Sequence, residues 1–387
     1  MRDSKYYTNC VHLLFFACLS FLGSCSSEEL IDEPASRAVL FNTTKGTVVV
    51  ENDTKTRAAT GDPDPAMDSM DDLLASGREV LIYGARYTDG DSPAWGAGAQ
   101  LFMNGLTGPV GKTGSDYRID YSPLKYYYPN DDERYDFKLF FPLPALGQAP
   151  SGVTVLQPAT GRPLGLRVDL SHRPDLLKAT LADKSKTAQP LELEFEHMLT
   201  SVVLKIVKED YEEPSDPSDP KPLKQDIYIN RLAVSGMMRG TYDIIKDEFE
   251  PPVKVNSDPD LVDVVSGVYL FDPGYNRDGE YLVPSAGEEA KRIYELFLFP
   301  VAPDASEARD DMERYFFDIW LNERLYSFTV PDRNDTGWEG WKAGERYTYT
   351  IKVSKADIYI ELDKDHISRE PWKTEDKGEV TIGGKDN

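Results

Sequence analysis

Short runs of aromatic and β-branched residues recur along this chain, and residues typical of turns separate them. Helical periodicity of three or more turns is hard to find, and only Met67–Ala75 and Arg173–Ala182 are typical of short helices. Many short strands without intervening helices predict an all-β protein built from antiparallel β-sandwiches. The predicted strands are Val80–Tyr83, Tyr135–Phe141, Leu191–Val207, Ile227–Val234, Val264–Phe271, Ile293–Phe299, Tyr315–Leu321, Leu325–Val330, Tyr347–Val353 and Ile358–Leu362.

The clearest alternation begins at Leu191, where apolar residues occupy one face and glutamates the other as far as His197. His197 shares the apolar face with Phe195, which favours a core histidine over a catalytic one. A polar stretch precedes this strand, so we expect a domain boundary near Thr187–Pro190. The proline-rich segment Glu212–Pro222 cannot supply ladder hydrogen bonds, and it predicts an exposed loop.

The N-terminus carries Arg2 and Lys5 before a short apolar stretch that ends in Leu22-Gly23-Ser24-Cys25. This order indicates a secretory signal over residues 1–24 rather than a membrane span. The last four residues resemble the lipobox of bacterial lipoproteins, in which the cysteine is acylated. We therefore expect a lipid anchor at Cys25 and a mature protein outside the cytoplasm. The acidic residues after Cys25 resemble a surface-export signal of Bacteroidetes lipoproteins, although an acidic tether explains them as well.

Composition removes several kinds of chemistry. The three cysteines are Cys10, Cys18 and Cys25, so the folded body has no thiol for disulfides, zinc sites or nucleophilic catalysis. A net charge of −24 repels nucleic acid. Gly111-Lys112-Thr113 ends like a phosphate loop, but Leu106 stands where the first glycine belongs. The chain has so many carboxylates that their number alone is no evidence for or against the catalytic carboxylate pair of a glycosidase. We expect no enzyme, cofactor or metal.

A strand-like segment lies soon after Cys25. Val39 and Phe41, then Thr47 and Val49, alternate on either side of a polar middle. Arg57 and Ala58 follow it. Loss of such a first strand exposes unpaired backbone groups and apolar pockets together, which is a template for strand addition.

Four features together resemble the fimbrillin family, the pilin-like lipoproteins of Bacteroidales. They are the lipobox at Cys25; the segment 38–50 with Thr56-Arg57-Ala58; the runs Leu101–Asn104, Tyr126–Pro129 and Tyr135–Pro142; and the runs Phe195–Leu199 and Trp341–Ile351. The resemblance implies two tandem transthyretin-like Greek-key β-sandwich domains, at 58–188 and 189–387, after a lipidated propeptide at 25–57.

The resemblance also implies a function. In such pilins an arginine-specific protease removes the first strand and a strand from another fimbrial subunit replaces it. The resemblance implies that the cut here lies between Arg57 and Ala58 and that the strand removed carries Val39, Phe41, Thr47 and Val49. Arg37 is a second candidate, but a cut there leaves the strand in place. The expected location is the cell outer membrane, and a fimbrium after processing, with a role in adhesion. The alternative is a non-polymerising surface lipoprotein that binds glycan or host ligand through Trp95, Trp338 or Trp341.

Overall fold

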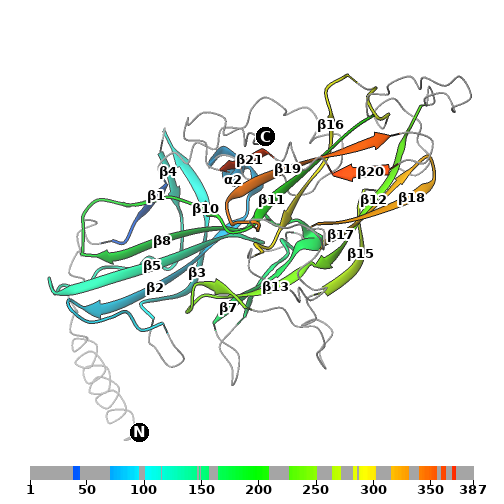
Figure 1. Ribbon diagram of the computed structural model, residues 1–387. Coiled ribbons are helices and arrows are strands. Elements are labelled where there is room, and N and C mark those ends of the chain that lie inside the picture. Colours follow the sequence, from blue (N-terminus) through cyan, green and yellow to red (C-terminus); the bar gives the residue numbers. More distant parts are fainter. Residues whose placement is uncertain are drawn as a thin grey trace, which may run out of the picture.

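The computed structural model describes residues 38–43, 70–95, 101–114, 116–145, 148, 150–156, 164–208, 226–250, 264–271, 282–285, 287–301, 315–330, 340–354, 359–362 and 368–371. Strands dominate the described residues, which confirms the all-β prediction (Figure 1). The predicted helix at 67–75 is helix α2, Met70–Ser76, within the described range.

The largest sheet has eight strands, in the order β10-β8-β5-β2-β3-β4-β1-β9. The edge strands β9 and β10 are separated in the chain only by Glu194 and Phe195, so the sheet curls until its two edges approach each other. The strands are β1 (Phe41–Thr43), β2 (Glu79–Thr88), β3 (Met103–Thr113), β4 (Asp116–Ile119), β5 (Glu133–Leu143), β8 (Leu177–Lys184), β9 (Leu191–Leu193) and β10 (Glu196–His197).

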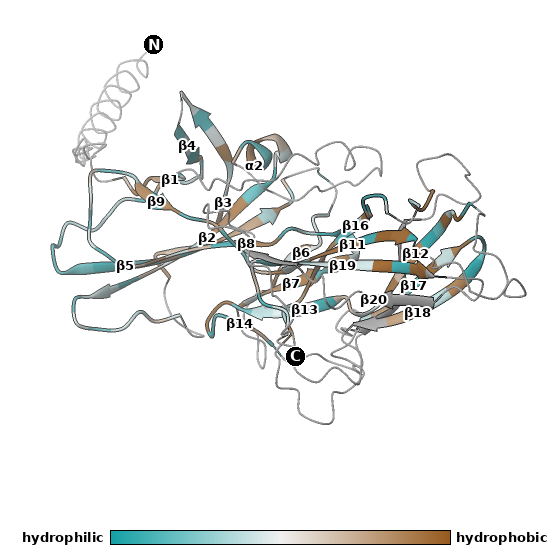
Figure 2. Cartoon of the chain, turned by 45° about the horizontal axis from the view of Figure 1, so that its top comes forward, coloured by the Kyte–Doolittle hydropathy of each residue, from teal (hydrophilic) through white to brown (hydrophobic). Residues whose placement is uncertain are grey.

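Two further sheets face each other and form a sandwich in the second half of the chain. Figure 2 shows hydrophobic residues along β11 and β12, one from each sheet, and their buried side chains share one core. One sheet has β16 (Lys291–Leu298), β11 (Thr200–Lys208), β19 (Glu345–Ser354), β20 (Tyr359–Leu362) and β21 (Ser368–Pro371). The other has β15 (Val264–Phe271), β12 (Ile229–Met237), β17 (Tyr315–Leu321) and β18 (Arg324–Val330).

A fourth sheet joins the two halves of the chain. It comprises β6 (Val153–Leu156), β7 (Gly165–Asp169), β13 (Arg239–Asp243) and β14 (Glu248–Phe249), with β13 antiparallel to β7. Strands β9 and β10 also follow residue 189 and belong to the eight-stranded sheet. Strand pairing therefore crosses the position at which the sequence predicts a domain boundary.

The second part of strand β5 is buried and almost entirely apolar. Every residue from Phe137 to Leu143 is buried. Phe137 and Phe141 belong to the core inside the curled sheet, whereas Phe140 belongs to the core shared with the second half. A strand covered on both faces has no solvent side, so apolar residues predominate and the one charged residue of this stretch, Lys138, needs a partner within the protein.

Two secondary-structure predictions from the sequence are wrong. The expected helix at 173–182 is a 3₁₀ turn, Leu170–His172, followed by strand β8, because Leu177, Ala179 and Leu181 pair with β5. Pairing and burial there outweigh the helical propensity of leucine and alanine. The expected single strand from Leu191 to Val207 is three strands, β9, β10 and β11, although the predicted alternation of buried and exposed side chains over 191–197 is present.

Candidate functional site

The first described strand, β1, lies inside the eight-stranded sheet rather than at its edge. It pairs antiparallel with β4, with Asn42 opposite Arg118, and parallel with β9, with Phe41 beside Leu191 (Figure 2). The segment before it, 38–40, continues along residues 124–126 through an antiparallel bridge between Ala38 and Tyr126. Residues 38–43 are therefore held by a different neighbour on each side.

The side chains of this segment alternate as the sequence predicts. Val39, Phe41 and Thr43 are buried, whereas Leu40 is 38% exposed. The Phe41 ring meets Phe137 edge to face, with centroids 5.2 Å apart. The core they enter also receives Met70 and Leu73 of α2. Each large side chain buried this way contributes about 1.5–3 kcal/mol.

Backbone and side-chain hydrogen bonds fix the segment. The Val39 amide donates to the Lys125 carbonyl oxygen over 2.9 Å, and the Leu191 amide donates to the Leu40 carbonyl oxygen over 2.7 Å. The Tyr121 hydroxyl donates to the Val39 carbonyl oxygen over 2.7 Å. Burial raises the pKa of Tyr121 to about 12, so the hydroxyl stays protonated and able to donate into the alkaline range as well as at neutral pH. Sequence reasoning missed Tyr121, because only the fold brings it to the strand.

Gly108 allows Tyr121 to reach this position. A Cβ added at Gly108 would lie 2.6 Å from the carbonyl oxygen of Asp120 and 2.7 Å from the Cα of Tyr121. Such distances are far inside van der Waals contact, so the chain after β4 crosses β3 only where β3 has no side chain. The Asp120 amide donates to the Pro109 carbonyl oxygen over 3.0 Å and secures this crossing.

Removal of residues 38–43 would leave both β4 and β9 with an unpaired backbone edge. It would also uncover the apolar side chains that surround Val39 and Phe41. An edge combined with apolar pockets is what an added strand requires. The other predicted site residues, Cys25, Thr47, Val49, Arg57 and Ala58, lie outside the described residues.

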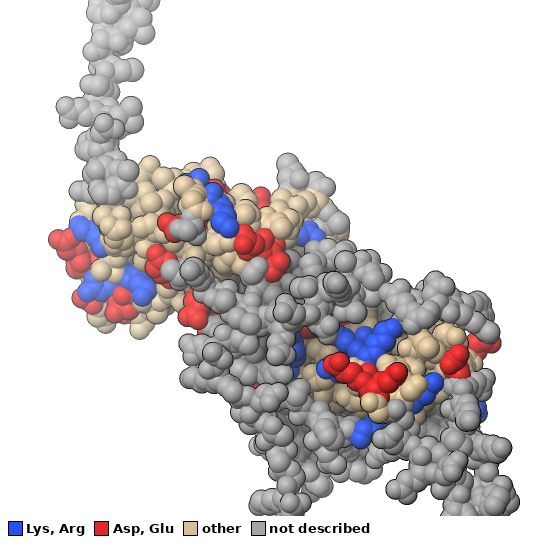
Figure 3. All heavy atoms as spheres, turned by 90° about the horizontal axis from the view of Figure 1, so that it is seen from above, with Lys and Arg blue, Asp and Glu red and all other residues tan. Residues whose placement is uncertain are grey.

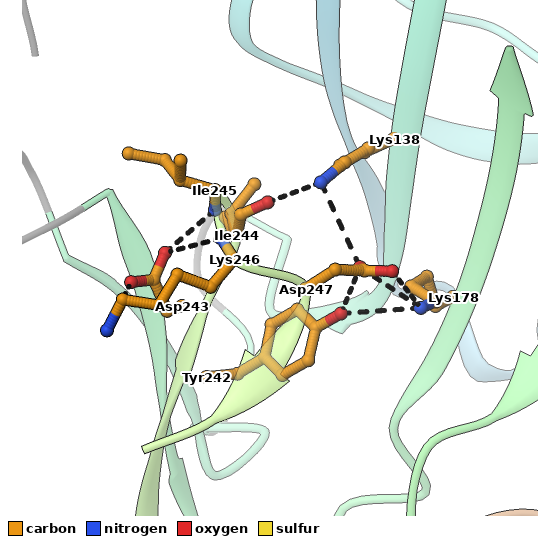
Figure 4. Close-up of polar contacts among 8 residues, drawn as sticks. All are labelled: Lys138, Lys178, Tyr242, Asp243, Ile244, Ile245, Lys246 and Asp247. Atoms are coloured by element: carbon orange, nitrogen blue, oxygen red, sulfur yellow. Dashed lines mark hydrogen bonds and ion pairs between the residues drawn. The ribbon is translucent and has the colours of Figure 1, made fainter. Parts of the chain in front are cut away.

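A second cluster of polar groups joins the two halves of the chain (Figure 4). Lys138 of β5 is 8% exposed and donates to the Ile244 carbonyl oxygen over 2.6 Å. Lys178 of β8 donates to both carboxylate oxygens of Asp247 over 3.1 Å, and the Tyr242 hydroxyl also donates to Asp247. Thus the turn between β13 and β14 is held against the eight-stranded sheet by two ammonium groups.

Electrostatics in this cluster fit a structural role. Burial lowers the pKa of Lys138. Burial acts to raise the pKa of Asp247, but hydrogen bonds from Tyr242 and Lys178 outweigh it, so that pKa is lowered. At neutral pH the carboxylate is charged and paired, and the cluster therefore connects elements rather than transferring protons.

The histidine predicted to lie in the core does so. His197 Nδ1 lies 2.7 Å from an oxygen of Asp175, and both side chains are buried. His172 is exposed in the 3₁₀ turn, and His366 lies outside the described residues. The described residues hold no group of three or more His, Cys, Asp or Glu side chains placed to bind a metal ion.

The tryptophans proposed for glycan binding are not equivalent. Trp341 is 1% exposed and donates from Nε1 to the Tyr349 hydroxyl over 2.8 Å, so the prediction that it offers a face to a sugar is wrong. Trp95 is half-buried, with the Lys138 ammonium 5.1 Å from its ring. Trp338 lies outside the described residues. Sequence reasoning passed over Trp320, which is half-buried with the Arg231 guanidinium 5.2 Å from its ring.

Acidic and basic side chains lie interspersed over the described surface that Figure 3 shows. This face therefore carries no broad basic patch of the kind that binds nucleic acid. Among the described residues, no helix combines the length and the apolar composition needed to cross a membrane.

Comparison with solved structures finds distant similarity over most of the chain. A presumptive cell adhesion protein of Bacteroides uniformis is 16% identical, with a TM-score of 0.45, 88% of this chain covered and 100% of that one. A protein of the same description from Bacteroides ovatus is 16% identical, with a TM-score of 0.44 and coverages of 88% and 98%. The tip fimbrial protein Mfa3 of Porphyromonas gingivalis is 9% identical, with a TM-score of 0.39 and coverages of 84% and 98%.

A search of curated proteins finds no match. The match to a protein family, in contrast, is extensive. Residues 74–383, which include nearly all of the described strands, match the family described as fimbrillin-like. This confirms the resemblance seen in the sequence. The chain belongs to the fimbrillin-like family.

Proposed function

We propose that this protein is a structural subunit of a fimbria that polymerises when its first strand is exchanged for a strand of a neighbouring subunit. Membership of the fimbrillin-like family supports a fimbrial subunit at the cell surface, with a structural rather than a catalytic role. The exchange itself is our proposal.

One observation carries it: β1 lies between β4 and β9 and fills a core, yet it precedes every other described element of the fold. An internal strand that comes first among the described elements can leave without any other described element being unthreaded. Val39 and Phe41 together contribute roughly 3–6 kcal/mol of burial, and a replacing strand regains this together with the backbone hydrogen bonds. Part of that gain is offset by the cost of ordering the donor.

Processing would proceed from the N-terminus. We propose that residues 1–24 are a signal peptide, that Cys25 carries the lipid anchor in the outer membrane, and that residues 25–57 are a propeptide. An arginine-specific protease that cuts between Arg57 and Ala58 would detach the anchor and residues 38–43 together. The strand would then be held only by non-covalent contacts and could dissociate.

We also propose that two sandwich domains, at 58–188 and 189–387, form the body. In this arrangement the strands β9, β10 and β13, which follow residue 189 but pair with strands of the first half, are the connection between the domains. We call the gap that β1 would leave between β4 and β9 the slot. A strand bound in the slot would then pair partly with the second domain, because β9 is one of the two strands that border it.

The test uses the mature protein, an arginine-specific protease and two matched variants. Arg57→Lys keeps the charge but removes the cleavage site, and Arg37→Lys does the same at the second candidate. We expect a new N-terminus at Ala58, followed by oligomers on size-exclusion chromatography, for the wild type and Arg37→Lys only. A chain that stays intact at Arg57, or is cut there and remains monomeric at high concentration, contradicts the proposal.

A further inference from the structure

The outward face of the first strand is apolar over part of its length. The bridge between Ala38 and Tyr126 sets an antiparallel register that places Leu40 opposite Leu124. Because Val39 points into the core, Leu40 points outward. Leu40, Leu124 and Tyr126 are 38%, 41% and 41% exposed and lie on the same face. We call these three residues the outer seam.

Farther along the strand the outward face is polar. Asn42, the next outward residue, pairs with Arg118 of β4 on one side and with Glu192 of β9 on the other. Arg118 and Glu192 are both exposed, and Arg118 forms an ion pair with Asp120 at 2.8 Å. The surroundings of the strand therefore change from apolar at Leu40 to charged at Asn42, within one repeat of the strand.

The outer seam has one member on the removable segment and two on the body. When residues 38–43 leave, Leu40 leaves with them, and Leu124 and Tyr126 lose a cross-strand neighbour. An incoming strand that alternates strictly between apolar and polar residues would fill the core, but it would place a polar side chain against Leu124 and Tyr126. Cross-strand pairs of this kind discriminate between partners by side-chain type.

We infer that the outer seam selects the donor strand by its outward side chain. The partner it fits is an extended strand of another fimbrial subunit with apolar residues at the three positions taken by Val39, Leu40 and Phe41. A polar residue follows at the position of Asn42. This inference rests on the proposed strand exchange and adds which donor the slot prefers.

Its test uses three synthetic peptides with the sequence of residues 36–48: the native sequence, a Leu40→Ser version and a Phe41→Ser version. The mature protein is cut with an arginine-specific protease, the protease is inactivated, and capture of each labelled peptide is measured by fluorescence polarisation. The native peptide is expected to bind about fivefold more tightly than the Leu40→Ser peptide, because part of a leucine is buried by the seam. The Phe41→Ser peptide, which lacks the central core residue, is expected not to bind.

The outcomes separate the inference from the function on which it rests. If the native and Leu40→Ser peptides bind equally and Phe41→Ser fails, strand exchange stands and selection by the outer seam is wrong. If no peptide binds to the cut protein, the exchange itself is wrong. A Leu124→Ser variant of the protein gives a second measurement: it should reduce the preference for the native peptide while it still captures the Leu40→Ser peptide.

Discussion

The hydroxyl group of Tyr121 donates a 2.7 Å hydrogen bond to the carbonyl oxygen of Val39, 82 residues earlier in the chain. Tyr121 belongs to the body of the protein, whereas Val39 belongs to the segment that we propose is exchanged. The acceptor is a backbone atom, so the bond does not depend on the side chain at position 39. Any strand with a carbonyl oxygen at that place can accept it. If the strand is exchanged, we expect Tyr121 to bind the backbone of the incoming strand and the outer seam to contact its side chains.

Replacement of Tyr121 by phenylalanine should loosen the first strand. The change removes one hydrogen bond and leaves a buried carbonyl oxygen without that donor, at a cost of about 1–2 kcal/mol. Amide hydrogen exchange in peptides covering residues 38–43 should become roughly five- to thirtyfold faster. Exchange in β19, within the sandwich of the second half of the chain, should not change. A Tyr126→Phe variant, altered at an exposed ring beside the same segment, is the control and should exchange like the wild type.

Alkaline pH should affect the same residue. The pKa of Tyr121 is raised by burial from 10.0 to about 12, so the folded state retains a proton that the unfolded chain loses. The contribution of this raised pKa to the free energy of unfolding is fully present below pH 10 and is lost as the pH rises toward 12. The tyrosinate absorbance of wild type minus Tyr121→Phe should titrate with a midpoint near pH 12. A midpoint near pH 10 would mean that the hydroxyl is not buried against the strand.

Substitution of Gly108 by alanine should destabilise the fold by about 1–3 kcal/mol, because the new methyl group overlaps the backbone at Asp120 and Tyr121. Gly114 offers the matched control. Its φ of 64° carries a backbone cost of about 1 kcal/mol for alanine, but open space surrounds it. Urea unfolding should give Gly108→Ala a lower free energy of unfolding than Gly114→Ala. Only Gly108→Ala should accelerate hydrogen exchange over residues 38–43. Equal exchange rates there would contradict the role of the crossing.

Replacement of Asp247 by asparagine should weaken the connection between the two halves. Lys178 loses its carboxylate partner and Lys138 a nearby negative charge, for an expected loss of about 1–3 kcal/mol. The pKa of Asp247 is lowered in the folded protein, so its contribution is present above the ordinary value of 3.8 and is lost as the pH falls through the lowered pKa. The free energy of unfolding should therefore fall less steeply with decreasing pH in the Asp247→Asn variant than in the wild type. Asp120→Asn, which breaks only an exposed ion pair, should cost less than about 1 kcal/mol.

The sequence was sufficient for features that depend on local pattern. The alternation around Val39 and Phe41 predicts their burial, and the aromatic run at 135–141 predicts a strand, which is part of β5. Features that depend on pairing between residues far apart in the chain could not be predicted from the sequence. Residues 173–182 read as a helix because leucine and alanine favour one, and only the register with β5 makes residues 177–184 a strand. Tyr121 gives no local signal, because its role arises from a crossing that Gly108 permits.

The curled sheet has a consequence for the gap that β1 leaves. Its two outermost strands, β9 and β10, are linked through Glu194 and Phe195, so β9 remains tied by covalent bonds to the far side when β1 departs. If β1 leaves, this covalent link limits how far β9 can move, and we expect a gap of about two strand spacings, roughly 10 Å, between β4 and β9. An opening of that width fits one extended chain.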